Sequence, residues 1–230
     1  MLLKCTQLSF KYPGSDTPVI DNLSFSMEHP GFNALFGPSG VGKTSFARLI
    51  AGSRTKSTET IQTRGLDTIL YSYNLERLPG WSSTGKHLDR VTAPGRQDLK
   101  QTLIDIFEIA DVLRSRFAQL SMGQQNRVNL IRYLLQDFDL LIMDESLANV
   151  DEKLRETIIL AIKDLFPEKL FLYISHNLME VSKFCREILV FSNPAELKGY
   201  SLIQGQDYRA GYALDKKKLD TTLLEIMDAF

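Results

Sequence analysis

The chain has 230 residues, 43% hydrophobic and 24% charged, which suits one globular unit with a substantial core. Its formal net charge of −1 shows no basic excess, so no nucleic-acid partner is expected. Two cysteines, Cys5 and Cys185, form no disulfide framework and fit a reducing cytosol with buried or idle thiols. No apolar stretch approaches a membrane span, and Lys4 and Gln7 interrupt the N-terminus too early for a signal peptide. If the protein works at a membrane, a partner must hold it there.

The N-terminal part of the chain predicts several strands and one helix. Alternating or apolar runs predict strands over 2–10, 19–27, 32–36 and 68–73. A helix is expected over 43–51, because Gly52 is a good stop residue. Residues 74–97 contain several prolines and glycines and are expected to be mostly loop.

In the second half of the chain, strands alternate with helices. Apolar residues at spacings of three and four predict helices over 99–117, 124–135 and 152–165, and a last amphipathic helix up to Phe230. Buried strands are expected over 139–143, 170–174 and 188–191. This alternation implies crossover connections, and therefore an α/β fold with a largely parallel sheet. The segment from about 74 to 135 lacks strand signals and predicts a helical insertion.

Residues 37–44 carry the pattern Gly-x-x-x-x-Gly-Lys-Thr, directly after an apolar run. Three glycines let the backbone fold around a polyphosphate, with several N–H groups pointing inward at the start of a helix. Lys43 is expected to reach the β- and γ-phosphates, and the Thr44 hydroxyl to ligate Mg²⁺. A glycine turn without a ligand is the weaker alternative. The expected nucleotide-binding residues here are Gly37, Pro38, Ser39, Gly40, Val41, Gly42, Lys43, Thr44 and Ser45.

Two acids, Asp144 and Glu145, stand at the end of the apolar run over 139–143. Neighbouring side chains of a strand point to opposite sides, so the two acids are expected to take different roles. Asp144 is the natural partner of Mg²⁺, through water, opposite Thr44. Glu145 is placed to orient or deprotonate a water near a γ-phosphate. The alternative is a pair of solvated acids, but a parallel sheet favours the first interpretation because it brings strand ends together.

Between these two motifs lies the run Leu120-Ser121-Met122-Gly123-Gln124-Gln125-Asn126-Arg127. It resembles the signature sequence of ATP-binding cassette (ABC) ATPases, usually Leu-Ser-Gly-Gly-Gln followed by Gln and Arg. The order of phosphate loop, helical insertion, signature, acidic strand end and a later histidine is also similar, over roughly residues 2–192.

The resemblance implies one nucleotide-binding domain over 1–230, with a three-layer α/β P-loop NTPase core and an N-terminal antiparallel β portion. It also implies a helical subdomain over about 74–135 and a C-terminal amphipathic helix over about 215–230. The last helix is expected to pack on its own domain, with a dimer contact or a regulatory role as the alternative.

In this family two subunits pair head to tail and enclose two ATP molecules. Ser121, Gly123 and Gln124 are therefore implied to contact the nucleotide held by the partner, and an N-cap at Ser121 is compatible with that role. His176 resembles the switch histidine that contacts the γ-phosphate. The implied catalytic residues are Lys43, Glu145 and His176. Asp151 resembles the acidic end of the D-loop (residues 146–151), which couples the two sites, and could equally cap the following helix.

Tyr12 resembles the aromatic residue that stacks on adenine, with ordinary packing as the alternative. Two positions depart from the family pattern. Met122 replaces the first glycine of the signature, and Asn74 stands where the family has the glutamine of the Q-loop. As the Q-loop residue, Asn74 is implied to bind the nucleotide and Mg²⁺, directly or through a water, because its side chain is one methylene shorter.

A separate cassette of this size resembles the ATPase subunit of an importer that binds ATP and Mg²⁺. Leu78-Pro79-Gly80-Trp81 is similar to the Leu-Leu-Pro-Trp stretch of nitrate, sulfonate and taurine importers. Leu75, Leu78 and Trp81 would then line a groove for the permease, or pack within the insertion. The implied partners are a transmembrane permease, a second ABC subunit and, through the permease, a solute-binding protein. The implied location is the cytoplasmic face of the cell membrane.

Three other functions stay open at this stage. An efflux-type ATPase shares every motif, and a soluble ABC ATPase would work without a membrane protein. A regulatory module that closes on ATP without turning it over is the third.

Overall fold

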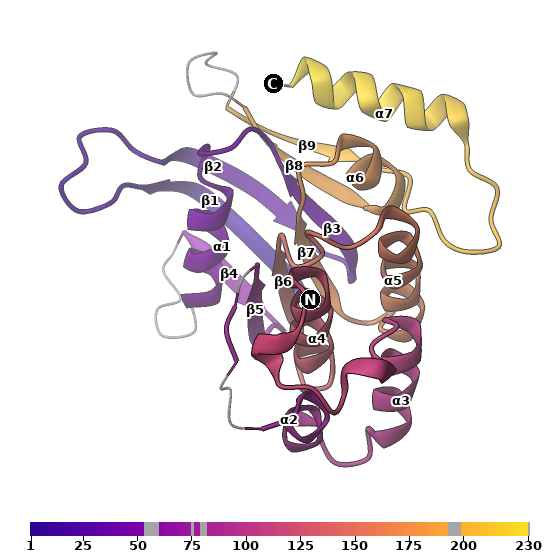
Figure 1. The fold of residues 1–230 in the computed structure, drawn as a ribbon. Coiled ribbons are helices and arrows are strands. Elements are labelled where there is room, and N and C mark those ends of the chain that lie inside the picture. The colour runs from indigo at the N-terminus through magenta and orange to yellow at the C-terminus, as the bar shows by residue number, and fades with distance from the viewer. Residues whose placement is uncertain (53–59, 75, 79–81, 193–198, 230) are drawn as a thin grey trace.

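The computed structural model describes residues 1–52, 60–74, 76–78, 82–192 and 199–229, whose strands form two sheets (Figure 1). The smaller sheet is antiparallel, in the order β2-β1-β4, and consists of Leu2–Phe10 (β1), Ile20–Met27 (β2) and Ile61–Arg64 (β4). The predicted N-terminal antiparallel portion is confirmed. Strand β4 was not predicted, because only Ile61 of its four residues is buried and the alternation is too short to recognise.

The larger sheet has the order β5-β6-β7-β3-β8-β9, and only β9 runs antiparallel to its neighbour. Its strands are Gly31–Phe36 (β3), Ile69–Tyr73 (β5), Leu140–Asp144 (β6), Leu170–Ile174 (β7), Glu187–Phe191 (β8) and Tyr200–Gln204 (β9). Every residue of β6 and β7 is buried, as expected for parallel strands covered on both faces. The parallel sheet is therefore confirmed, whereas the edge strand β9, with one buried residue, was not predicted.

The helices of the described residues are Lys43–Gly52 (α1), Thr84–Val91 (α2), Gln97–Ile106 (α3), Met122–Leu134 (α4), Glu152–Leu165 (α5), Leu178–Phe184 (α6) and Lys216–Asp228 (α7). Both faces of the larger sheet are covered by helices (Figure 1). Helix α1 lies between the two sheets, where the ring of Phe46 contacts Phe25 of β2 and Phe191 of β8. Apolar residues of α4 and α5 pack on the opposite face of the sheet, with Phe171 of β7 in the same core (Figure 1). These layers are the three-layer P-loop NTPase fold that was expected.

In the segment between the phosphate loop and the acidic strand end, one helix was missed and another was predicted too long. Most of the described residues in 74–97 lie outside helices, as expected, but the range also contains α2, whose two buried residues, Thr84 and Leu88, are too few to give a visible periodicity. The predicted helix over 99–117 ends at Ile106, and Glu108 takes a left-handed conformation (φ +50°) that a right-handed helix cannot include. Short 3₁₀ turns follow it, and the apolar spacing that continues beyond Ile106 belongs to these turns. Outside this segment, the short helix α6 was also not predicted.

The C-terminal helix α7 packs on its own domain. Leu219 and Ile226 are buried, and Thr222 Oγ1 donates a hydrogen bond to the Gln204 carbonyl of β9 (3.2 Å). A second bond joins Ser192 Oγ to the Ala229 carbonyl (2.6 Å). These contacts favour the packing interpretation over a free regulatory element. Phe230 lies outside the described residues.

Candidate functional site

The order of the strands brings three predicted motifs to one edge of the larger sheet. Strands β6, β7 and β3 are neighbours and parallel, so their carboxyl ends lie side by side. Asp144 ends β6, His176 follows β7, and the phosphate loop follows β3. Ligands of open parallel sheets bind outside the carboxyl ends of the strands, so this edge is where a nucleotide is expected.

The phosphate loop needs glycine for two separate reasons. Gly37 and Gly42 have φ values of +147° and +103°, which side-chain-bearing residues rarely adopt. A Cβ at Gly37 would also lie 2.4 Å from the Phe191 carbonyl oxygen, and one at Gly42 would lie 2.9 Å from the side chain of Val19. The loop is therefore tightly seated between β8 and the segment before β2.

Lys43 turns back into the loop that precedes it. Its Nζ donates hydrogen bonds to the carbonyls of Gly37 (2.7 Å) and Pro38 (2.6 Å), and its side chain is buried. Burial lowers the pKa of this ammonium, and the nearby carboxylates Glu145 and Asp144 act in the opposite direction. The cation is thus already held inside the loop that would surround the phosphates.

Both acids and most of the predicted phosphate-loop residues face one cavity of about 300 Å³, whereas Gly37, Pro38 and Val41 do not line it. Its lining residues are Tyr12, Val19, Ser39, Gly40, Gly42, Lys43, Thr44, Ser45, Asp144, Glu145, Ile174 and His176. Tyr12 is 43% exposed, and its hydroxyl lies 2.9 Å from Ser45 Oγ. Its ring meets Phe10 only edge-on, with ring centroids 5.0 Å apart. An exposed ring at the cavity edge has a face available for stacking, unlike an ordinary core tyrosine.

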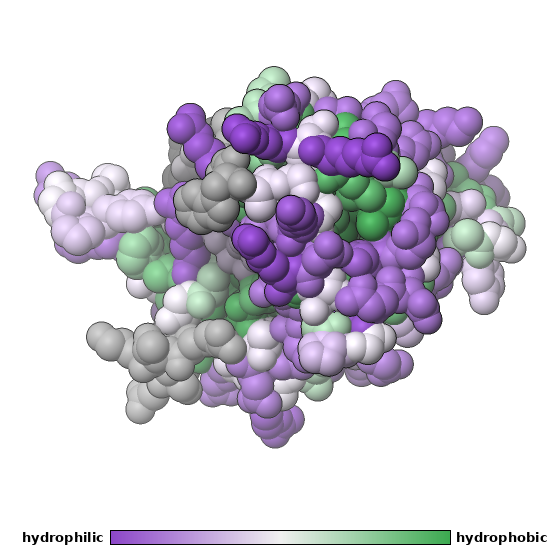
Figure 2. All heavy atoms as spheres, turned by 60° about the horizontal axis from the view of Figure 1, so that its bottom comes forward, coloured by the Kyte–Doolittle hydropathy of each residue, from purple (hydrophilic) through white to green (hydrophobic). Residues whose placement is uncertain are grey.

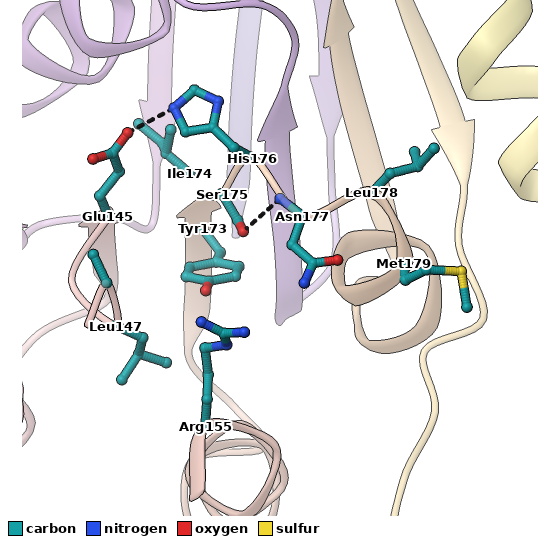
Figure 3. Close-up of a pocket in the computed structure, with 11 residues that line it drawn as sticks. Glu145, Leu147, Arg155, Tyr173, Ile174, Ser175, His176, Asn177, Leu178 and Met179 are labelled. Carbon is teal, nitrogen blue, oxygen red and sulfur yellow. Dashed lines mark hydrogen bonds and ion pairs between the residues drawn. The ribbon is translucent and has the colours of Figure 1, made fainter. Parts of the chain in front are cut away.

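Asp144 and Glu145 line the same cavity although they are neighbours in sequence. Strand β6 ends at Asp144, and Glu145 takes a left-handed conformation (φ +52°), so the alternation of a strand no longer applies. The two acids nevertheless have different partners. Tyr71 Oη donates to Asp144 Oδ2 (2.7 Å), whereas Glu145 Oε1 lies 2.7 Å from His176 Nε2 (Figure 3). Sequence reasoning predicted the separate roles but missed Tyr71.

The oxygen atoms at the cavity fit a magnesium–nucleotide complex. Thr44 supplies a hydroxyl and Asp144 a carboxylate with one oxygen, Oδ1, not used by Tyr71. The described residues contain no group of three or more His, Cys, Asp or Glu that could hold a metal by themselves. Mg²⁺ commonly keeps several waters and binds through one or two protein oxygens plus substrate phosphates, so a sparse donor set suits it.

Asn74 lies beside the cavity but does not line it. Its backbone N–H donates to the Asp144 carbonyl (3.0 Å), and its side-chain oxygen accepts from Asn126 Nδ2 (3.0 Å). Asn126 also donates to the Ala148 carbonyl (2.7 Å), so one buried amide joins the Q-loop position to the D-loop. The sequence carried no signal for this contact, because Asn74 and Asn126 are 52 residues apart along the chain.

The signature residues Ser121, Gly123 and Gln124 also lie outside the lining of this cavity. Ser121 caps α4: its Oγ accepts from the Gln124 backbone N–H (3.3 Å), while Gln124 Oε1 accepts from the Ser121 N–H (2.9 Å). A Cβ at Gly123 would lie 2.3 Å from the Asn149 carbonyl oxygen. A glycine is therefore required at position 123 because the D-loop of the same chain lies so close, independently of any contact with a partner's nucleotide.

Asp151 likewise lies off the cavity and caps a helix. Its Oδ1 accepts from the backbone N–H groups of Lys153 (3.0 Å) and Leu154 (3.3 Å) at the start of α5. The capping alternative is thus confirmed.

Comparisons with known proteins agree with this geometry. A family model described as ABC transporter matches residues 20–148. The taurine import ATP-binding protein TauB of Pseudomonas fluorescens is 29% identical over 241 residues, covering 97% of this chain and 91% of that protein. The spermidine/putrescine import ATP-binding protein PotA of Legionella pneumophila is 29% identical over 210 residues, which cover 84% of this chain. This chain spans only 57% of the length of that relative.

Among solved structures, a bacterial Atm1-family ABC exporter with ATP bound has a similar fold. The TM-score is 0.69 at 18% identity, over 83% of this chain and 36% of the exporter chain. In the described part of this chain, no helix has both the length and the apolar character needed to cross a bilayer. The family match covers more than half of the sequence and includes the glycine loop, the signature run and both acids of the cavity, so the chain belongs to the ABC transporter family.

Proposed function

We propose that this chain is the ATP-hydrolysing subunit of an ABC importer and powers solute uptake through a separate membrane permease. The observation that carries the proposal is the single cavity in which Lys43, Glu145 and His176 meet. The similarity to TauB along 97% of the chain favours import over efflux.

The residues of the cavity have different roles in the proposed hydrolysis. The loop N–H groups and Lys43 hold the phosphates and stabilise negative charge on the transferring group. Thr44 and Asp144 would hold Mg²⁺, which neutralises charge on the phosphate oxygens when it is bound. Tyr12 would stack on adenine.

Glu145 is the general base of the proposed reaction. It takes a proton from the water that attacks the γ-phosphorus as the bond to ADP breaks, leaving ADP and phosphate. His176 Nε2, 2.7 Å from Glu145 Oε1, fixes the direction of that carboxylate, and its side chain lines the cavity in which the γ-phosphate would lie. The left-handed conformation of Glu145 is what turns its side chain into the cavity beside Asp144.

One chain supplies only part of the proposed reaction centre. Ser121, Gly123 and Gln124 do not line the cavity of their own chain, so a second subunit would bring them to the open side of the triphosphate. We infer that this partner is an identical copy and that Asp151, at the end of the D-loop, couples the two sites. Asn74 would act on the bound nucleotide and metal through a water, because its side-chain oxygen already accepts from Asn126.

The permease would dock near the segment that follows Asn74. Leu78 is partly buried and packs against the main core, which favours the packing alternative for that residue. Leu75 and Trp81 lie outside the described residues. Figure 2 shows the molecule with the lower side of Figure 1 turned forward, a mainly hydrophilic face with a smaller hydrophobic area.

Steady-state phosphate release and recovery from membranes test the proposal. We expect Mg-ATP hydrolysis by the purified chain, its loss in Lys43→Ala, and copurification with a permease from a strain that also makes a solute-binding protein. ATP binding without phosphate release would instead identify a regulatory module. Hydrolysis without any membrane partner would identify a soluble ABC ATPase, and a permease without a solute-binding protein would identify efflux.

A further inference from the structure

A buried carboxylate lies behind the turn that carries His176. Glu180, on α6, is 7% exposed and does not line the nucleotide cavity. Its Oε1 accepts hydrogen bonds from Tyr173 Oη (2.7 Å) and Ser175 Oγ (2.9 Å). Its Oε2 forms an ion pair with Arg155 Nε of α5 (2.5 Å). A buried carboxylate is costly unless it is partnered, and here Oε1 accepts two hydrogen bonds while Oε2 is paired with a cation.

The bonds of Glu180 hold both neighbours of His176. Ser175 Oγ donates to Glu180 and accepts from the Asn177 backbone N–H (3.1 Å). Asn177 Oδ1 in turn accepts from the Glu180 backbone N–H (3.1 Å). The residues before and after His176 are therefore fixed from one side, while the imidazole extends the other way toward Glu145 (Figure 3).

The turn has little other support on its open side. A hollow of about 590 Å³ adjoins Glu145 and His176 and is also lined by Arg155, Tyr173 and Asn177 (Figure 3). Apolar packing cannot fix the turn where the hollow borders it. Besides its own contact with Glu145, the imidazole therefore depends for its position on the polar contacts that converge on Glu180.

We propose that Glu180, with Arg155, is a positioning residue that sets the placement of His176 against Glu145. The proposal rests on the proposed ATPase function for its kinetic consequence. Arg155 extends the effect to α5, which begins at the cap Asp151 directly after the D-loop. A movement of the D-loop would thus be transmitted to His176 through the ion pair between Arg155 and Glu180.

The chain offers a matched control on the same two helices. Lys183 of α6 and Glu156 of α5 form an ion pair (2.7 Å) that is more exposed and makes no contact with residues 175–177 among the described bonds. Glu180→Gln and Glu156→Gln both remove one carboxylate charge from the α5–α6 contact. Only the first should disturb the His176 turn.

The kinetic test is a double-mutant cycle with His176→Ala. Glu180→Gln should lower kcat about ten-fold with little change in Mg-ATP affinity, and Glu156→Gln should leave both unchanged. In the His176→Ala background, Glu180→Gln should have almost no further effect, because its consequence passes through the imidazole. An undiminished ten-fold loss in that background would overturn the proposal.

A spectroscopic test does not depend on ATPase activity. The chain has three histidines, so the imidazole resonances of His176 can be separated from those of His29 and His87 by NMR. Glu180→Gln should shift the His176 signals and leave the other two in place, whereas Glu156→Gln should shift none. Unmoved His176 signals would contradict the proposal even if the wild-type chain hydrolyses ATP.

If Glu180→Gln fails to fold, Ser175→Ala decides the question. This variant removes only the hydroxyl that joins the turn to Glu180. The same shift of the His176 signals and a smaller loss of kcat are expected. A folded Ser175→Ala protein with wild-type His176 signals and kcat would overturn the proposal.

Discussion

Asn126 of the signature helix donates a hydrogen bond to the side-chain oxygen of Asn74, at 3.0 Å. The same amide nitrogen donates to the Ala148 carbonyl at 2.7 Å. A backbone carbonyl can only accept, so the Asn126 amide must present its NH₂ group here, and Asn74 must present its oxygen. The segment that carries Asn74, the helix α4 and the segment that carries Ala148 thus meet at one buried amide.

Asn126→Asp should destabilise the fold without changing the size of the side chain. The carboxylate would place negative charge against two acceptor oxygens and leave both without a donor, at a cost of about 1–3 kcal/mol or more. Urea denaturation would measure this as a lower midpoint. Asn22→Asp, at an exposed position, is the control and should leave the midpoint unchanged. Equal stability of the two variants would show that the amide contacts contribute nothing.

Gly123→Ala should separate the start of α4 from the D-loop. A Cβ there would lie 2.3 Å from the Asn149 carbonyl oxygen, so one of the two backbones must move. A loss of unfolding free energy of about 1–3 kcal/mol is expected, measured by chemical denaturation. Gly52→Ala is the matched control, since no heavy atom lies within 4 Å of a Cβ added at Gly52. A Gly123→Ala protein as stable as this control would contradict the close approach.

Tyr71→Phe should weaken the effect of Mg²⁺ on nucleotide binding. The hydroxyl of Tyr71 fixes Asp144 Oδ2 at 2.7 Å, and burial together with this carboxylate raises the pKa of the phenol, so it remains a donor at neutral pH. Losing a partner that orients a metal-binding carboxylate commonly costs about ten-fold in metal affinity. The Mg²⁺ concentration for half-maximal binding of a fluorescent ATP analogue would measure the change.

Tyr73→Phe is the control for that measurement. The ring of Tyr73 stacks on that of Tyr71, with ring centroids 5.7 Å apart. Tyr73 is 42% exposed, and the hydroxyl that bonds Asp144 belongs to Tyr71. It should retain the wild-type Mg²⁺ requirement. A Tyr71→Phe protein with the same requirement would remove Tyr71 from the metal site.

Glu145→Gln should bind ATP and almost stop turning it over. The amide retains the shape of the side chain but cannot accept the proton of the attacking water, a loss of about 10²–10⁴-fold in kcat. ATP should then stay bound in a stable dimer, seen by light scattering with Mg-ATP. Phosphate release near the wild-type rate would remove Glu145 from the role of base.

Cys5 and Cys185 should not react with thiol reagents while the protein is folded. Both are buried, and burial raises the pKa of the Cys5 thiol to about 12 and that of Cys185 well above its usual value. At pH 8 neither side chain is a thiolate, so colour from Ellman's reagent should develop only after urea is added. Rapid reaction of one thiol in the native protein would show that this part of the core opens.

Sequence alone was enough to place the residues whose positions depend on their immediate neighbours along the chain. The glycine loop, Lys43, Asp144 and Glu145 each sit at the end of an apolar strand, and the alternation of strands and helices predicted the parallel sheet that brings those ends together. The short elements were missed because their own sequences carry too weak a pattern. Helix α2 and strand β9 bury only two residues and one residue respectively, which is too few for a periodic signal.

Only the tertiary structure decided which side chains support the site. Tyr71 meets Asp144 across 73 residues, and Asn126 meets Asn74 across 52, through the pairing of β5 with β6 and the placement of α4 beside them. Spacing along a chain records contacts within a strand, a turn or a helix, whereas partners this distant are set by strand register and helix packing. The residues that meet in the cavity could therefore be predicted from the sequence, and the contacts that hold them in place could not.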